Sequence, residues 1–419
     1  MGALLRSALR RLTARLYIGR RRMRRYQVTA MGVCLTALGA ATAFSDPPTA
    51  LSVVAALAGI VVSSMEILSN VRRSRKIRFQ RREADDYRDL LSRYEKSGQV
   101  VRTPRDVGIR MAAETDFLQN HPVEAEVNQE PFTVHPHIEQ FSLLFLSHRM
   151  RRSVIFDGLT LGLDADIPTT PNMPAIFRPV RYYHFVSTNL LSPYDVGEVG
   201  RQEPLLRGRS LIFDSRGHLR QLALSRLANV VGVSVLAFTT EGKLLLASQT
   251  LDVAGSPGLV APSGSGALEP CDLAGGGAGS FQRTILNGAL RELREECHLE
   301  QEDFEGEAEV IGYGRWISRG AMPEFCGLAL LNKSADQILR KPIRPDERSF
   351  VGDVAAVRLP PVLDWSAVNP LDLLPPTYRH AASWPLAFGL TCLVEKMQDP
   401  SWDLGKKLKS RLGGGSEAA

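Results

Sequence analysis

The chain has 419 residues, of which 44% are apolar and 23% are charged. This is the composition of a folded protein with more than one structural unit, and it excludes general disorder, collagen and a disulfide-rich miniprotein. The net charge of +6 is unevenly distributed, because residues 1–82 carry +14 and the remainder carries −8. Since the main body is mildly acidic, we expect no binding of duplex nucleic acid.

The cysteines are few and scattered, and no two of them form a C-x-x-C pair. A disulfide framework and a thiolate zinc site are therefore not expected, and a reducing compartment fits this pattern. The residues are Cys34, Cys271, Cys297, Cys326 and Cys392.

The basic N-terminal part contains two charge-free stretches, residues 26–45 and 47–65. Each is about long enough to cross a ~30 Å hydrocarbon core as a helix. Pro47 favours a turn between them, and arginine clusters at both outer ends resist translocation. We therefore predict a two-helix transmembrane hairpin over residues 26–70, in the inner membrane, with the N-terminus and the main body in the cytoplasm.

A cleaved signal peptide and a pair of buried core helices are the alternatives for this segment. The long basic region and the second apolar stretch disfavour the first alternative, and the arginine clusters disfavour the second. Small residues recur at four-residue spacing, for example Ala55, Gly59 and Ser63. Such spacing allows helices to approach closely. The contact can lie within the hairpin or between chains, and in the second case the protein would self-associate.

The segments beside the hairpin also have helical patterns. Residues 1–25 predict a basic amphipathic helix suited to an anionic inner leaflet, and residues 71–98 predict a charged linker helix. Residues 99–225 contain no motif and are expected to form an extension packed beside the following domain. Within it, residues 178–185 combine arginines with aromatic rings, which suits either the stacking of a base or a strand with its rings in the core.

From residue 226 the expected elements become regular. Residues 230–238 and 243–248 predict a β-hairpin, and two glycine-rich segments that lack the Gly-Lys-Ser/Thr of a P-loop follow it. Apolar residues at helical spacing predict a helix over 281–299. Two further strands are expected over 308–318 and 324–331, and a last helix over 383–397.

Three carboxylates, Glu292, Glu295 and Glu296, lie at positions i, i+3 and i+4 of the helix over 281–299 and therefore share one face. Such a face suits a hard divalent cation such as Mg²⁺, which can bind a diphosphate and activate a water molecule. A solvated acidic face paired with Arg291 and Arg294 is the simpler alternative.

The same segment resembles the Nudix box, R-E-U-x-E-E-x-G-U, where U is aliphatic. The matching residues are Arg291, Glu292, Leu293, Glu295, Glu296 and Leu299. The resemblance covers about residues 226–398 and implies an α/β (α+β) fold. This would be a Nudix-like α/β/α sandwich with a mixed sheet over residues 226–400, preceded by the transmembrane hairpin and followed by a flexible tail at 401–419.

The resemblance also implies roles for single residues. Glu292, Glu295 and Glu296 would bind Mg²⁺, and Glu292 would be catalytic if the chain is a hydrolase. Nucleotide binding would involve Gly264, Gly266 and Arg291.

The sequence departs from the family pattern at two places. Arg283 stands at the glutamate position counted from Gly277, so an insertion before the helix is expected, with Glu269 as a substitute carboxylate. His298 replaces the box glycine, at a position that usually has a positive φ. A further glutamate often completes the site in this family, and the candidates are Glu307, Glu309 and Glu324.

The combination of hairpin and diverged Nudix box resembles the membrane-anchored effectors of bacterial cyclic-oligonucleotide antiphage signalling (CBASS), with a SMODS-associated Nudix domain. It implies binding of a cyclic oligonucleotide or another nucleotide, followed by membrane disruption and cell death. A membrane-tethered, Mg²⁺-dependent hydrolase of a nucleoside diphosphate derivative is the alternative. A scaffold without nucleotide affinity is a third possibility.

Overall fold

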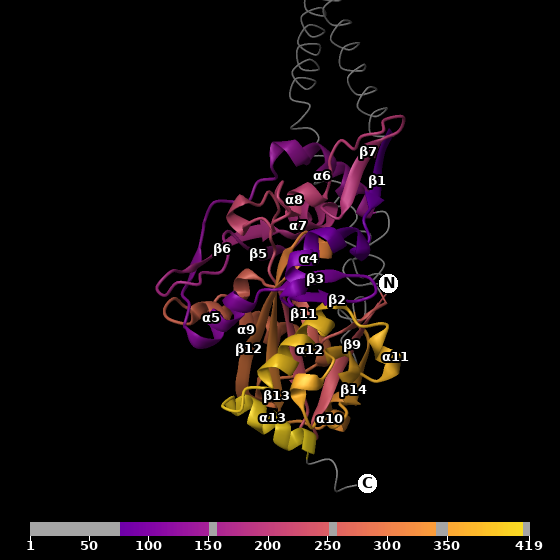
Figure 1. Ribbon diagram of the computed structural model, residues 1–419. Helices are drawn as coiled ribbons and strands as arrows, with labels where there is room; N and C mark the ends of the chain where they lie inside the picture. Colours follow the sequence, from indigo (N-terminus) through magenta and orange to yellow (C-terminus); the bar gives the residue numbers. More distant parts are fainter. Residues whose placement is uncertain (1–75, 151–156, 251–257, 341–350, 414–419) are drawn as a thin grey trace, which may run out of the picture.

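The computed structural model describes residues 76–150, 157–250, 258–340 and 351–413. They form a mixed α/β fold with one nine-stranded sheet, one three-stranded sheet and one two-stranded sheet. In Figure 1 the extension lies in the upper part of the view and the large sheet lies below it, with the C-terminal helices in yellow.

The predicted transmembrane hairpin is not supported. No helix in the described part of the chain is long and apolar enough to cross a membrane. Helix α9 (Ser280–Cys297) is charged, and the apolar helix α12 (Trp384–Lys396) has 13 residues where about 20 are needed. Residues 26–70 lie outside the described residues, as does the segment 1–25. We therefore correct the prediction of a preceding hairpin and of a multi-pass inner-membrane location.

The large sheet has the strand order β10-β9-β8-β13-β12-β3-β2, with β11 paired to β8 and β14 paired to β9. Strands β8 and β13 are parallel, and the other neighbours are antiparallel. The predicted strands at 230–238, 243–248, 308–318 and 324–331 are confirmed as β8, β9, β12 and β13. The strands are β2 (Val100–Arg102), β3 (Val107–Arg110), β8 (Gly232–Phe238), β9 (Lys243–Gln249), β10 (Val260–Ala261), β11 (Gly264–Ala267), β12 (Phe304–Trp316), β13 (Met322–Leu331) and β14 (Val351–Arg358).

Helices α9 and α12 cover opposite faces of this sheet, and both match predicted helices. Successive side chains of a strand point to opposite faces. Accordingly, Phe325 and Ala329 of β13 belong to the core under α9, whereas Cys326 and Leu328 belong to the core under α12. The two cores fix the helices on which the candidate site depends.

The extension does not lie only beside the large sheet, as expected, but also continues it. Strand β3 pairs with β12, with Ile109 opposite Arg315. Arg315 also contacts Asp166 of the extension at 3.2 Å. The elements of the extension are β4 (Ala125–Val127), β5 (Leu159–Leu163), β6 (Ala175–Arg181), β7 (Tyr194–Glu198), α5 (Ala112–Asn120), α6 (Pro136–Arg149), α7 (Tyr182–Thr188) and α8 (Arg209–Ile212).

The segment 71–98 was predicted to be one linker helix, but its described part is not a single helix. It contains strand β1 (Ile77–Arg81), which pairs with β7, and then helix α4 (Arg88–Lys96). Two short helices of the C-terminal part are α10 (Ala335–Leu339) and α11 (Pro376–Arg379).

The predicted flexible tail also differs from the structure, because Asp403–Gly413 forms helix α13. Leu404 and Leu408 of this helix are fully buried. Arg411 donates hydrogen bonds to the carbonyl oxygens of Leu331 at 2.7 Å, Thr239 at 3.2 Å and Phe238 at 3.3 Å. The helix therefore closes the ends of the parallel strands β8 and β13.

We expect Arg411→Ala to lower the free energy of unfolding by about 2 kcal/mol, because charged hydrogen bonds to carbonyls at the strand ends are lost. Urea denaturation would measure the change. The control is Lys409→Ala, which removes an exposed cation from the same helix. Equal effects of the two substitutions would contradict the role given to Arg411.

Candidate functional site

Helix α9 begins and ends with left-handed residues, which set its limits. Gly279 precedes it with φ 75°, and His298 follows it with φ 56°. The N–H of His298 caps the helix on the carbonyl of Arg294. His298 therefore adopts the left-handed conformation for which glycine is normally preferred, although it replaces the glycine of the box pattern.

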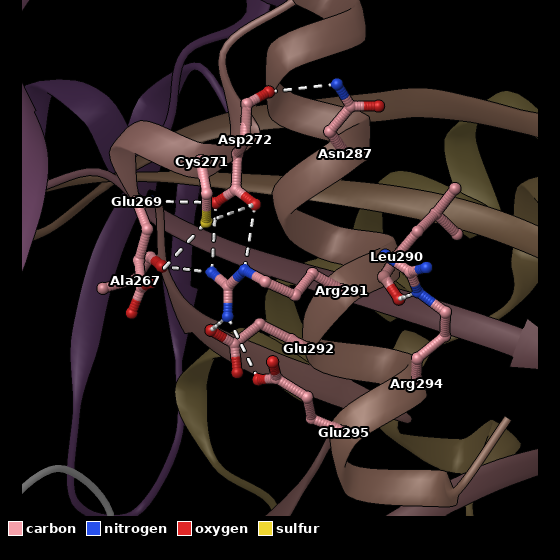
Figure 2. Close-up of polar contacts among 10 residues, drawn as sticks. All are labelled: Ala267, Glu269, Cys271, Asp272, Asn287, Leu290, Arg291, Glu292, Arg294 and Glu295. Carbon is pink, nitrogen blue, oxygen red and sulfur yellow. Dashed lines mark hydrogen bonds and ion pairs between the residues drawn. The ribbon is translucent and has the colours of Figure 1, made fainter. Parts of the chain in front are cut away.

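Arg291 is the centre of a cluster of polar contacts (Figure 2). Its Nε donates to Asp272 Oδ1 at 2.9 Å, and its Nη2 donates to Asp272 Oδ2 at 3.1 Å and to the carbonyl of Ala267 at 2.9 Å. Nη1 donates to Glu292 Oε1 at 2.9 Å and to Glu295 Oε2 at 3.1 Å. One guanidinium group thus joins helix α9 to the end of β11 and to the turn that follows it.

The carboxylate of this turn that binds Arg291 is Asp272, not Glu269. Asp272 is 3% exposed, and its Oδ2 also accepts a hydrogen bond from the N–H of Glu269 at 2.8 Å. Glu269 and Asp272 together cap the short turn at Pro270. A reciprocal acidic cap of this kind is visible in a sequence as two acids three residues apart, and this signal points to Asp272.

Burial and charge shift the pKa values in this cluster in opposite ways. Burial alone would lower the pKa of Arg291, but the hydrogen bonds to Asp272 and the charge of Glu292 raise it above its usual value. Burial raises the pKa of Glu292 to about 7, and Arg291 opposes this rise. Arg291 therefore stays charged, while Glu292 exchanges a proton near neutral pH.

The predicted Mg²⁺ ligands are not arranged as a metal site. Glu292 and Glu295 both form ion pairs with Arg291. Glu296, the residue directly after Glu295, is buried, at 7% exposed. Among the described residues, no group of three or more His, Cys, Asp or Glu side chains could hold a metal ion. As arranged, these residues do not fit Mg²⁺, because the guanidinium of Arg291 takes the place of a cation between the carboxylates.

Gly264 and Gly266 allow β11 to approach α9 closely. A Cβ atom on Gly264 would lie 2.5 Å from the backbone nitrogen of Leu293, and one on Gly266 would lie 2.1 Å from the carboxyl group of Glu292. The structure thus assigns both glycines to packing against the helix. Their nucleotide-binding role stays a prediction.

A cavity of about 160 Å³ lies at the other face of β11. Gly264 and Gly266 face α9, so Ser265 and Ala267 alternate to the opposite face, and both line the cavity. Gly266 lines it as well, so the cavity and the Arg291 cluster share strand β11 as a wall.

Aromatic rings and one arginine form much of the remaining wall. Tyr182 and Phe185 of α7 line the cavity together with Trp316 at the end of β12. The guanidinium carbon of Arg319 lies 3.7 Å from the centre of the Trp316 ring. Burial lowers the pKa of Arg319, and the charge of Asp106 opposes this shift.

For the segment 178–185, the sequence left both a ligand site and a core strand open. In the structure, its aromatic residues and its arginines have different surroundings. Its rings at Tyr182 and Phe185 line the cavity, but its arginines do not. Arg178 forms an ion pair with Asp164 at 2.6 Å, and Arg181 forms one with Asp157. The arginine beside the rings is Arg319, more than 130 residues away in the sequence, which the local pattern could not indicate.

The three candidates for a further glutamate have different positions. The side chain of Glu307 lies outside the described residues. Glu309 accepts a hydrogen bond from Trp402 Nε1 at 2.7 Å and is thereby tied to the C-terminal part. Glu324 of β13 is 2% exposed and lines the cavity. Burial raises its pKa to about 8, and the charge of Arg319 opposes the rise.

Comparison with known proteins adds little to this description. No family model and no curated protein matches the sequence. One solved structure with some similarity is DR0079 from Deinococcus radiodurans, at 14% identity and a TM-score of 0.22, over 35% of this chain and 80% of that one. The Nudix and antiphage terms suggested by the sequence receive no support from these comparisons.

We expect Gly264→Ala to lower the free energy of unfolding by about 1–3 kcal/mol, because the new Cβ would overlap the backbone of α9 at Leu293. Thermal or urea denaturation would measure the loss. Gly275→Ala is the matched control, since a Cβ there meets no atom within 4 Å. A stability of Gly264→Ala equal to that of the control would show that α9 and β11 are less closely packed than described.

Glu324 predicts a pH dependence of stability. The unfolded chain releases this proton near pH 4.5 and the folded chain near pH 8, so the free energy of unfolding should fall as pH rises between these values. Glu324→Gln should make this fall shallower. The free energy of unfolding of this variant should still fall with pH up to about pH 7, because the pKa of Glu292 is also raised in the folded chain.

Urea denaturation at several pH values would measure both slopes. Glu302→Gln, which changes an exposed carboxyl group, is the control and should leave the slope unchanged. If Glu324→Gln also left the wild-type slope intact, Glu324 would not be the buried acid responsible.

Proposed function

We propose that the chain is a nucleotide-binding protein that holds its ligand in the cavity between α7, β11 and the ends of β12 and β13. The observation that carries this proposal is the cavity itself, with the rings of Tyr182 and Phe185 beside the guanidinium of Arg319. Aromatic rings stack on bases, and guanidinium groups bind phosphate oxygens. These are the two kinds of group that a nucleotide requires.

The size of the cavity limits how much of a ligand it encloses. Its volume of about 160 Å³ corresponds to on the order of ten water-sized groups. That is enough for one base and too little for a whole dinucleotide. A cyclic oligonucleotide, the ligand class expected from the sequence, would place one of its bases in the cavity and leave the rest outside.

Arg291 favours binding without rapid hydrolysis. Its guanidinium holds the carboxylates that hydrolysis would require for a cation, namely Glu292 and Glu295. Releasing them would leave Nη1 of Arg291, whose side chain is 14% exposed, without its carboxylate partners, while Nε and Nη2 stay bound to Asp272. Separating a buried ion pair is costly, and the intact cluster therefore stabilises α9 rather than a reacting phosphate.

We expect nucleotides to bind to the wild-type chain in isothermal titration calorimetry with nucleoside mono-, di- and triphosphates and with cyclic di- and trinucleotides. Arg319→Gln should weaken the best ligand roughly tenfold, because a charged contact to phosphate is lost. Arg283→Gln, which changes an exposed arginine of α9, should have no effect. Absence of binding across the panel would refute the proposal.

Hydrolysis of a nucleoside diphosphate derivative is the second candidate function. The observation that favours it is Glu292, whose pKa of about 7 suits a general base at neutral pH. Release of phosphate from the same panel with Mg²⁺ or Mn²⁺, abolished by Glu292→Gln, would establish it. This result would contradict the proposal of binding without turnover.

A further inference from the structure

A row of four paired residues crosses the large sheet beside the cavity, and one of them alone has a side chain larger than a methyl group. Glu324 of β13 pairs with Gly232 of β8, and Ala267 of β11 and Gly314 of β12 continue the row on either side. Directly paired residues place their side chains on the same face of a sheet. Ala267 and Glu324 both line the cavity, so the small residues of this row leave space around a single carboxyl group.

Gly232 and Gly314 show to which side this carboxyl group turns. A Cβ atom on Gly314 would lie 2.9 Å from the ring of Phe388, so this ring fills the space over β12. A Cβ atom on Gly232 would overlap Oε2 of Glu324, so the carboxyl group lies over β8. The strand that pairs with β8 on the other side is β11, and its residues 265–267 line the cavity. The carboxyl group of Glu324 is therefore turned away from Phe388 and toward the wall that β11 forms.

Glu324 is a buried acid without an ion pair. The residue is 2% exposed, and within the described part of the chain no cation forms an ion pair with it. Burial raises its pKa to about 8, and the charge of Arg319 and a hydrogen bond with Ser234 oppose the rise. At neutral pH the carboxyl group is therefore mostly protonated, with one O–H donor and a carbonyl oxygen as acceptor.

Glu324 interacts with two other titratable groups, Cys326 and Arg319. Burial raises the pKa of the Cys326 thiol to about 12, so this group stays protonated near neutral pH. Burial lowers the pKa of Arg319, so its guanidinium group can contribute to a pH dependence of binding. The groups whose charges act on Arg319 besides Glu324 are Asp106, Tyr182 and Arg149. A substitution at position 324 is therefore required to isolate the effect of the carboxyl group.

We propose that Glu324 recognises the base of the nucleotide, with its neutral carboxyl group donating one hydrogen bond to the ring edge and accepting another from the adjacent N–H group. The edges of adenine and cytosine present this pair, a ring nitrogen beside an amino group. An ionised carboxylate would only accept hydrogen bonds and would require two neighbouring donors, as on guanine. The rings of Tyr182 and Phe185, which line the same cavity, stack on the base, and the phosphates lie on the side of Arg319. This inference rests on the proposed function and makes Glu324 its specificity-determining residue.

Titration calorimetry at neutral pH with AMP, with CMP and with ribose phosphate, which lacks a base, would test the inference. AMP or CMP should bind more tightly than ribose phosphate. Glu324→Ala removes both hydrogen bonds and should weaken the better nucleotide roughly tenfold. Glu324→Gln, whose amide group also has a donor and an acceptor, should keep the affinity within about threefold. Glu302→Gln, which changes an exposed carboxyl group, is the control and should have no effect.

The same titrations between about pH 7 and about pH 9 provide a second readout. Only the protonated acid donates a hydrogen bond, so the wild-type affinity for AMP or CMP should fall as the pH rises above about 8, approaching about tenfold per pH unit. In Glu324→Gln this fall should disappear, apart from any share of Arg319, which both proteins retain. GMP should lose less affinity than AMP in the wild type, because an ionised carboxylate can accept hydrogen bonds from the two neighbouring donors of guanine.

The outcomes separate this inference from the proposed function. If nucleotides bind and Glu324→Ala leaves their affinity intact, the base lies elsewhere, and the inference fails while the proposed function stands. The inference also fails if Glu324→Gln loses as much affinity as Glu324→Ala, or if ribose phosphate binds as tightly as AMP and CMP. Should Glu324→Ala not fold, the pH series decides alone, and a fall of affinity in Glu324→Gln equal to that of the wild type overturns the inference. If no nucleotide binds, both proposals are refuted.

Discussion

The close approach of helix α9 to strand β11 is the constraint on which the rest of the site depends. It requires glycine at both positions of β11 that face the helix, Gly264 and Gly266. It also requires charge compensation, because the helix brings Glu292 to the strand at a position with little access to water. Arg291 supplies this compensation and adds a hydrogen bond to the carbonyl of Ala267. As a result, β11 is a thin wall with a charged cluster on one face and a cavity on the other.

The same wall separates the acids of the chain into two groups with different surroundings. Glu292 and Glu295 share Arg291 on the face of α9, whereas Glu324 lies in the cavity on the face of α12. Burial raises the pKa of both Glu292 and Glu324, but Arg291 forms an ion pair with Glu292 and holds its pKa to about 7, whereas that of Glu324 reaches about 8. The cavity wall therefore offers a neutral polar group near pH 7, which suits a base better than a phosphate.

The sequence predicts the regular elements of the C-terminal part well, because β-branched runs and the apolar stripe of α9 have clear periods. It also identifies the charged face of α9, but it does not show that the carboxylates of this face are bound by Arg291. Spacing places Glu292 and Glu295 on one face, yet only the fold brings Asp272 close enough for Arg291 to bind all three acids. The cavity could not be predicted at all, because Tyr182, Gln249 and Ser383 are distant in the chain and carry no motif.

The cavity belongs to the extension as much as to the large sheet, because residues of both parts line it. Helix α7 supplies Tyr182 and Phe185, and the extension is held to the sheet by the pairing of β3 with β12 and by the contact of Arg315 with Asp166. Residues 226–400, taken alone, would keep Trp316 and Glu324 but would lose the rings of Tyr182 and Phe185. Since stacking on rings supplies much of the affinity for a base, nucleotide binding in the proposed form is a property of both parts together. This gives the extension, which has no recognisable motif, a direct part in forming the cavity.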